Sequence, residues 1–370
     1  RQYYLLLDIS GSFLCKFICY MIHLTTYGSP ILCLCFFIKK TKSCKQVMFY
    51  FNAKQDESVT MLNGRIARTP ITTNFNDKTK TKAAFGEITF TPDIPFELTL
   101  SARYEQEHHQ RKGKSAMFSI NRDKKYNVFL PKADIAWKIN DDQRLGFKVG
   151  KGYNPGGAGV TFGVPYTSYE YDAEYVWNYE LYHRWTSADK RLRINSNLFY
   201  NDYKDMQLPF TLGPNSIVIR NADKVVTYGA EINTEWQATE KLALNAGIGM
   251  LKTDIKRYPN SSIEGNKLAR APSFSGKVGA NYRLLDHLEI GTNYSYNSSY
   301  YSTADNLANG KVGHYDQLDV YLAYDFKHAR ITLYADNVLN SRKDILLVPR
   351  SGDITRQPER QIGLSTELRF

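Results

Sequence analysis

Apolar and polar residues alternate along most of this chain with the period of a β-strand. At the carboxyl end, Ile362, Leu364, Thr366 and Leu368 fall on one side of an extended segment, and their neighbours are polar or glycine. Because successive side chains of a strand point to opposite faces, this pattern predicts a strand with one apolar and one polar face. The same alternation recurs in FELTLSARYE (96–105) and LRINSNLFYNDY (192–203).

The order of the connections between these segments carries further information. From about residue 58 onward we expect about 13–14 strands, most of them about 9–12 residues long, with short turns and long loops alternating strictly. A soluble β-sandwich has shorter strands and no reason to sort its loops by length. An outer-membrane barrel has short turns at one end and long loops at the other. The pattern therefore predicts an all-β, antiparallel transmembrane β-barrel.

The aromatic residues agree with this prediction. The chain of 370 residues contains 27 Tyr and 19 Phe, and many Tyr and Trp lie near the predicted strand ends, as at Trp177, Tyr200 and Trp236. Amphipathic rings of this kind suit the interface between lipid and water. Ordinary cross-strand packing is the alternative for any single ring.

The first 54 residues differ from the remainder. All five cysteines lie there, and two apolar runs, FLCKFICYMIHL and ILCLCFFIKK, are each too short to span a bilayer as a helix. The segment starts with Arg1 and has no clear cleavage site for a signal peptide. We expect residues 1–54 to be foreign to the native domain, as a truncated or mis-framed start would be, and residues 55–370 to form a partial barrel. An anchor or export signal is the alternative.

Composition and motifs argue against several other functions. The net charge of +11 forms no continuous basic stripe, and no nucleic-acid-binding motif is present. His108 and His109 have no third ligand at useful spacing, so we expect no metal site. The segment GYNPGGAG (152–159) lacks the Lys-Ser/Thr of a phosphate loop and reads as a flexible external loop. We find no catalytic residues, expect no cofactor, and predict that the protein is not an enzyme.

Several segments, in order along the chain, resemble the barrel domain of TonB-dependent outer-membrane receptors. The most specific is PKADIAWKINDDQRLGFKVGKGYNPGG (131–157). Others are YVWNYEL (175–181), LFYNDYKDMQ (198–207), RNADKVVTYGAEINTEW (220–236), GNKLARAPSFSGKVGANY (265–282), LYADNVLNSR (333–342) and the terminal QIGLSTELRF. The resemblance covers roughly residues 55–370.

This resemblance implies a 22-stranded barrel plugged by an amino-terminal domain, which contacts the TonB complex through a short amino-terminal box. No plug-like sequence and no such box is found, so we expect the chain to correspond to the carboxyl-terminal part of the barrel and not to transport alone. Phe370 would be the end recognised by the barrel-assembly machinery. The implied function is uptake of a large nutrient, with a ferric siderophore as the leading class, at the outer membrane of a Gram-negative bacterium. A passive porin-like or adhesin barrel is the alternative.

In such a receptor the ligand contacts would come from loop cations and aromatic residues. Cations attract an anionic ferric chelate, and Tyr can stack on or hydrogen-bond to a bulky ligand. For each candidate the alternative is a solvated loop side chain that faces water or lipopolysaccharide. Outer-membrane lipid and lipopolysaccharide are further expected partners. The candidates are Arg111, Lys112, Tyr153, Tyr166, Tyr169, Tyr171, Tyr300, Tyr301 and Arg342.

Overall fold

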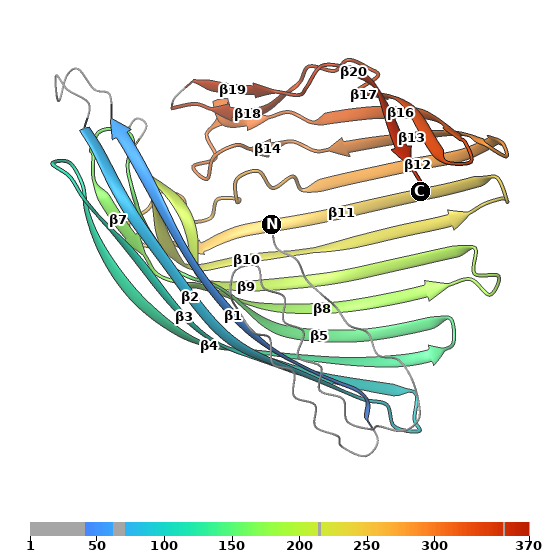
Figure 1. Ribbon diagram of the computed structural model, residues 1–370, viewed down its shortest axis with the longest axis horizontal. Helices are drawn as coiled ribbons and strands as arrows, with labels where there is room; N and C mark the ends of the chain where they lie inside the picture. The colour runs from blue at the N-terminus through green and yellow to red at the C-terminus, as the bar shows by residue number, and fades with distance from the viewer. Residues whose placement is uncertain (1–40, 62–70, 214–215, 351, 370) are drawn as a thin grey trace.

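One antiparallel sheet of 14 strands dominates the computed structural model, which describes residues 41–61, 71–213, 216–350 and 352–369. Each strand pairs with its neighbours in chain order, apart from the small strands inside loops, and Figure 1 shows the whole as a curved sheet from β1 to β20. In the described part of the chain, β1 pairs only with β2, and β20 only with β17. The predicted all-β antiparallel fold and its strand number are confirmed.

The strands of the main sheet have the following bounds: Thr41–Met61 (β1), Ile71–Phe90 (β2), Phe96–Lys114 (β3), Ser119–Asn140 (β4), Gln143–Asn154 (β5), Glu174–Thr186 (β8), Leu192–Gly213 (β9), Ser216–Gln237 (β10), Leu242–Arg257 (β11), Phe274–Leu285 (β12), Leu288–Asn297 (β13), Tyr315–Asp325 (β16), Ala329–Asp336 (β17) and Gln361–Leu368 (β20). Three two-stranded sheets lie in the loops. They pair Gly157–Val160 (β6) with Ser168–Tyr171 (β7), Tyr300–Tyr301 (β14) with Lys311–Val312 (β15), and Asp344–Val348 (β18) with Asp353–Arg356 (β19). One short 3-10 helix, η1, covers Ala308–Gly310. Within these ranges no helix is long and apolar enough to cross a membrane.

The connections divide the sheet into two ends. At the short-turn end, the strands are joined by residues 91–95, 141–142, 187–191, 238–241, 286–287 and 326–328. At the opposite end, which we call the long-loop end, residues 155–173, 258–273, 298–314 and 337–360 form long connections. The predicted sorting of turns and loops is therefore present at these connections.

Two stretches predicted as long loops are strand instead. β3 and β4 continue through HHQRKGK and SINRDKK and are joined by residues 115–118, and β9 and β10 continue to Gly213 and from Ser216. Backbone pairing does not depend on side-chain polarity, so the ladder continues where the apolar alternation stops. The strands of these two hairpins consequently reach 19 to 22 residues rather than the expected length.

The sheet also begins earlier than predicted. β1 starts at Thr41 and pairs with β2 along its length, from Thr41 opposite Phe90 to Met61 opposite Ile71. The predicted boundary between residues 54 and 55 thus lies inside a strand. Apolar alternation does not indicate this strand, because it contains polar residues such as Asn52, Lys54 and Asp56. Residues 1–40, including most of the cysteine-rich segment, lie outside the described residues.

The two faces of the sheet differ in chemistry. Leu98, Leu100 and Phe147 are among many large apolar side chains that are exposed on what we call the apolar face. On the opposite, polar face, Glu97 accepts from Arg144 at 2.6 Å, and Tyr182 donates to Asp134 at 2.8 Å. A contiguous exposed apolar surface of this kind is typical of contact with lipid.

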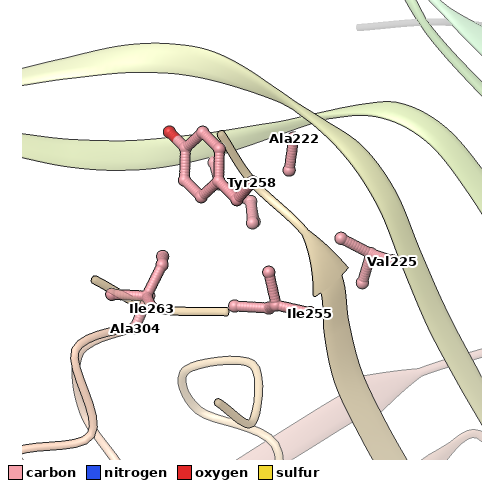
Figure 2. Close-up of a cluster of buried hydrophobic side chains, with 7 residues drawn as sticks. Ala222, Val225, Ile255, Tyr258, Ile263 and Ala304 are labelled. Atoms are coloured by element: carbon pink, nitrogen blue, oxygen red, sulfur yellow. The ribbon is translucent and has the colours of Figure 1, made fainter. Parts of the chain in front are cut away.

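Loops at the long-loop end enclose a local hydrophobic core over β10 and β11. Figure 2 shows Ala222, Val225, Ile255, Tyr258, Ile263 and Ala304 gathered there, and all of them are buried. The Gly265 amide also donates a hydrogen bond to the Ile255 carbonyl oxygen at 2.8 Å. This packing fixes the 258–273 loop onto the sheet.

Candidate ligand-binding surface

A cluster of tyrosine, arginine and acidic side chains lies at the long-loop end of β3, β4, β5 and β8. Its members come from alternate positions of β3 and β4, from the end of β5, the start of β8 and the β6–β7 hairpin. Period-2 alternation places Glu107, His109 and Arg111 on one side of β3, and Arg122 and Tyr126 on the matching side of β4. We call this set the Tyr–Arg cluster: Glu107, His109, Arg111, Arg122, Tyr126, Tyr153, Tyr169, Tyr171 and Tyr175.

Arg122 is the most buried cation of the cluster. Its side chain is 2% exposed, and its Nη2 donates to Tyr126 Oη at 2.5 Å and to the Tyr171 carbonyl oxygen at 3.2 Å. Glu170 approaches its Nε at 3.6 Å, which exceeds hydrogen-bond distance. Nε and Nη1 are buried without a hydrogen-bond partner in the structure. A buried, incompletely paired guanidinium is costly for folding and is suited to binding an anion.

Three tyrosine rings contact one another in series, beginning with the ring of Tyr126 beside Arg122. The ring centroids of Tyr126 and Tyr153 are 5.9 Å apart, and those of Tyr153 and Tyr175 are 5.5 Å apart. Tyr153 Oη donates to Glu107 at 3.3 Å, and His109 Nε2 lies 2.6 Å from the same carboxylate. Lys151 Nζ lies 4.9 Å from the centre of the Tyr175 ring. The structure therefore combines cations with aromatic rings in one surface.

The β6–β7 hairpin covers part of this surface. Arg122 on the polar face of β4 contacts β7, and β7 also lies against β10, where the Asp172 amide donates to Asn221 at 2.8 Å. The hairpin therefore spans the polar face between β4 and β10 (Figure 1). Part of the Gly-rich segment that reads as a flexible loop is thus strand, because residues 152–154 belong to β5 and residues 157–159 to β6.

Glycines permit that hairpin to pack closely. A Cβ atom on Gly159 would lie 2.6 Å from Tyr169 Oη, and one on Gly157 would overlap the Tyr171 ring. A Cβ atom on Gly156 would meet the backbone oxygen of Tyr171 and lie 2.8 Å from Arg122 Nη2. The two tyrosine rings lie 6.3 Å apart, and burial raises the pKa of Tyr169.

The first two predicted residues, Arg111 and Lys112, point to opposite faces. Arg111 forms ion pairs with Glu57 at 2.7 Å and Asp77 at 2.9 Å, and it stacks 4.6 Å over the centre of the Phe75 ring. Lys112 is exposed on the other face. Adjacent residues of a strand cannot share a face, so only Arg111 lies with the Tyr–Arg cluster.

The remaining candidates are divided between two regions. Tyr153, Tyr169 and Tyr171 belong to the Tyr–Arg cluster, whereas Tyr166 packs against a buried group that includes Phe118 and Val160. Tyr300, Tyr301 and Arg342 lie in loops further along the sheet. Tyr300 is buried and donates to the Ile345 carbonyl oxygen at 2.6 Å, Lys311 lies over the Tyr301 ring, and exposed Arg342 pairs with Glu359 at 3.1 Å. Phe370 lies outside the described residues.

Five members of the cluster were not among the predicted residues: Glu107, His109, Arg122, Tyr126 and Tyr175. Continuing the alternation of β3 and β4 through their polar parts would have placed the first four of these on one face, because both strands continue there. His108 and His109 diverge, since His108 binds Asp123 at 2.6 Å and His109 binds Glu107. Across the described residues, no group of three metal-binding side chains comes together.

Comparison with known proteins decides the family. The family model described as "TonB dependent receptor-like, beta-barrel" matches residues 46–340. The chain belongs to this family. The pesticin receptor of Yersinia pestis is 23% identical over 308 residues, which are 79% of this chain and 44% of that receptor. The chain thus spans less than half the length of this relative.

Solved structures share the fold. The ferric yersiniabactin uptake receptor FyuA from Yersinia pestis is similar with a TM-score of 0.72 and 19% identity, over 92% of this chain and 53% of that one. The siderophore receptor PiuA from Acinetobacter baumannii has a TM-score of 0.70 and 13% identity, over 90% of this chain and 53% of that one. The ferric citrate transporter FecA has a TM-score of 0.66 and 14% identity, over 92% of this chain and 53% of that one. These relatives are named as receptors and transporters rather than enzymes.

Proposed function

We propose that this chain is barrel sequence of an outer-membrane receptor for TonB-energised uptake of a ferric siderophore in a Gram-negative bacterium. The observation that carries the proposal is the Tyr–Arg cluster, which presents the buried Arg122 guanidinium beside a series of tyrosine rings. An anionic ferric chelate offers oxygen atoms to the guanidinium and a bulky face to the rings. The named functions of FyuA, PiuA and FecA support the same ligand class.

Coupling to the TonB complex would run through an amino-terminal plug and box, and insertion would use the barrel-assembly machinery with Phe370 as the recognised end. The protein would catalyse no reaction and hold no cofactor, since the iron is cargo. A passive porin-like or adhesin barrel remains the alternative, and the apolar face would suit it equally. The incompletely paired buried cation favours a binding protein over an open pore.

The binding test uses outer-membrane vesicles that carry the full chain. Retention of ⁵⁵Fe supplied as ferric yersiniabactin or ferric citrate is compared between the native chain and two variants. We expect Arg122→Gln to weaken retention at least about tenfold, because one charge-assisted contact is worth about 1.5–3 kcal/mol. Arg342→Gln, at the exposed pair with Glu359, serves as the matched control and should change retention less than about twofold.

If the native chain retains neither chelate, or if Arg122→Gln and Arg342→Gln behave alike, the Tyr–Arg cluster is not the binding surface. Rapid swelling of liposomes in small neutral solutes would then support the porin-like alternative.

A further inference from the structure

The polar face carries a groove across β9–β12 that begins at the short turn formed by residues 187–191. Tyr182 of the polar face lies opposite Asn197 of β9, and strand alternation places Arg193 on the same face. Glu235 of β10 lies directly opposite Arg193. The groove has a volume of about 590 Å³, which is within the range of small-molecule sites, about 300–1,000 Å³. It is separate from the Tyr–Arg cluster, which lies at the long-loop end.

Basic side chains outnumber acidic ones in this groove. Its charged lining residues are Lys190, Arg191, Arg193, Glu235 and Lys277. Lys190 contacts Asp142. The Arg191 guanidinium donates from Nε to the Gln237 carbonyl oxygen at 2.8 Å and from Nη2 to the Ala238 carbonyl oxygen at 2.9 Å. These two cations are therefore held in place by the protein itself.

Arg193 and Lys277 are the cations that remain available. Both residues are exposed, and neither forms an ion pair or a side-chain hydrogen bond with another residue that the structure describes. Glu235 lies opposite Arg193 in the sheet, but these two side chains form no ion pair within the described ranges. A groove with unpaired cations has a positive potential that attracts anions.

Two glycines keep the floor of the groove open. A Cβ atom on Gly247 would lie 2.8 Å from Lys277 Cε and 2.9 Å from Asn233 Oδ1. A Cβ atom on Gly279 would lie 2.6 Å from Asn245 Nδ2. Because neither glycine has a side chain, the lysine and the two amides lie close to the sheet, and the space above them is available to a ligand.

Amide side chains give the groove hydrogen-bonding groups of both kinds. Asn233 and Asn245 form no side-chain hydrogen bond in the part of the chain that the structure describes, and each offers an NH₂ donor and a carbonyl acceptor. Trp236 is the one aromatic residue among the described residues that line the groove, and its position opposite Leu244 assigns its side chain to the apolar face. Cations and amides without aromatic rings suit the carboxylate and hydroxyl groups of a hydroxycarboxylate better than they suit a catechol.

We propose that this groove is a second binding site for an anionic iron chelate of the hydroxycarboxylate class, such as ferric citrate. The inference rests on the proposed function for the presence of the chelate, which would reach the groove along the polar face from the Tyr–Arg cluster. The groove binds the chelate more weakly than the cluster does, because Arg193 and Lys277 are exposed and solvent screens their charges, whereas Arg122 is buried. Weak binding allows release toward the short-turn end.

The first test counts binding sites by equilibrium dialysis of the full chain in uncharged detergent against ⁵⁵Fe-labelled ferric citrate. The native chain should show a tighter and a weaker class of site. We expect R193Q/K277Q to weaken binding at the weaker class at least about tenfold and to leave the tighter class unchanged. The control K132Q/K252Q removes two cations that lie outside the groove, on β4 and β11, and should leave both classes unchanged.

Three outcomes of this test overturn the inference. They are an unchanged weaker class in R193Q/K277Q, an equal loss in K132Q/K252Q, and loss of both classes in R193Q/K277Q. The second outcome would show that the net charge of the chain, rather than the groove, attracts the chelate. The third would show that the two classes are not separate sites. Retention of the tighter class shows that the groove variant is folded.

The second test examines the space and the chemistry of the groove. Ala243 lies on its floor opposite Gln237, so Ala243→Leu narrows the groove, whereas Ala280→Leu on the apolar face of β12 is the control. Affinity at the weaker class should fall at least about fivefold in the first variant only.

Competition on the native chain then identifies the class of ligand. Iron-free citrate should displace the chelate from the weaker class, and dihydroxybenzoate, a catechol with one carboxylate, should not. Equal competition by the two compounds would contradict the hydroxycarboxylate assignment. Displacement by a glutamate-rich peptide at a lower concentration than citrate would identify the groove as a docking surface for protein and overturn the inference.

Arg122→Gln separates this inference from the proposed function. Loss of the tighter class in Arg122→Gln, with loss of the weaker class in R193Q/K277Q, supports both. A native chain with only the weaker class, sensitive to R193Q/K277Q, would contradict binding at the Tyr–Arg cluster and leave the groove as a binding site. A native chain with only the tighter class would overturn the inference and leave the proposed function standing.

Discussion

The β1–β4 and β9–β11 regions are built from hairpins of similar length, but they distribute charge differently. In β9–β11, three cations near the long-loop end lie next to aspartates, and loops cover a hydrophobic core on the polar face. In β1–β4, Lys78, Lys80 and Lys82 on the apolar face form no ion pair within the described residues. Arg122 on the polar face is buried, and its Nε and Nη1 lack a hydrogen-bond partner. The β9–β11 region leaves a neutral hydroxyl, that of Tyr258, without a hydrogen-bond partner, whereas the β1–β4 region leaves part of a buried cation without one.

The largest expected effect concerns the buried cores of the two regions. Ile255→Ala in β11 and Ile120→Ala in β4 both remove a buried side chain, with 0% and 4% of its surface exposed. Each should lower the free energy of unfolding by about 2–5 kcal/mol, since a cavity remains. Hydrogen exchange should show opening of the 258–273 loop in the first variant and of the β6–β7 hairpin in the second, which packs on the Ile120 cluster. Opening of the same segment in both variants would show that the two cores do not hold different segments in place.

A glycine substitution tests how the β6–β7 hairpin reaches Arg122. Gly156→Ala places a Cβ atom against the Tyr171 backbone oxygen, so we expect destabilisation by about 1–3 kcal/mol and weaker ⁵⁵Fe retention. Gly313→Ala is the matched control, because no atom lies within 4 Å of its Cβ position. Thermal unfolding in detergent measures both variants, and equal melting temperatures would contradict the close packing.

Tyr258 should make the β9–β11 core sensitive to alkaline pH. Burial raises the pKa of Tyr258 to about 12, and its hydroxyl has no hydrogen-bond partner in the structure. The neutral phenol is favoured in the folded state, so its contribution is complete below the unfolded pKa of about 10 and is lost as pH rises toward 12. Proteolysis of the 258–273 loop should therefore accelerate above pH 10 in the native chain and less in Tyr258→Phe. Equal acceleration in both would show that other groups cause the change.

The smallest expected effect is the change in the free energy of unfolding when single lysines are replaced, measured in uncharged detergent. Lys224→Gln removes an exposed pair with Asp202 and should cost at most about 1 kcal/mol. Lys80→Gln relieves repulsion and should be neutral or stabilising by about 0.2–1 kcal/mol. Chemical unfolding of the two variants measures this, and an equal loss of stability in both would show that the lysines of β2 do not repel one another.

The alternation in the sequence predicts the sheet wherever one face meets apolar surroundings. The strand around Leu98 and Leu100 was predicted correctly for this reason. It fails where both faces are polar, as at Lys78, Lys80 and Lys82, because the residues that pack inward there, such as Thr73 and Thr81, are themselves polar. Backbone pairing, which maintains those strands, leaves no trace in side-chain hydrophobicity.

The candidate site was predicted in part. Tyr153, Tyr169 and Tyr171 were identified from a loop rich in Gly and Tyr, and the structure brings them to one surface with Arg111. Arg122 and Tyr126 were missed because their importance comes from contacts with Tyr171 and Tyr153, which are distant in the sequence. Burial of Arg122 depends on the β6–β7 hairpin folding over it, and local residue patterns do not indicate such packing.

The most direct measurement locates iron in the folded protein. Crystals of the chain soaked with ferric yersiniabactin or ferric citrate would be measured at the iron absorption edge, and the anomalous difference map would place the metal. We expect one strong peak beside Arg122, Tyr126 and Tyr153. A peak among Tyr300, Tyr301 and Arg342, or on the apolar face, would contradict the claim that the β1–β4 region binds the chelate.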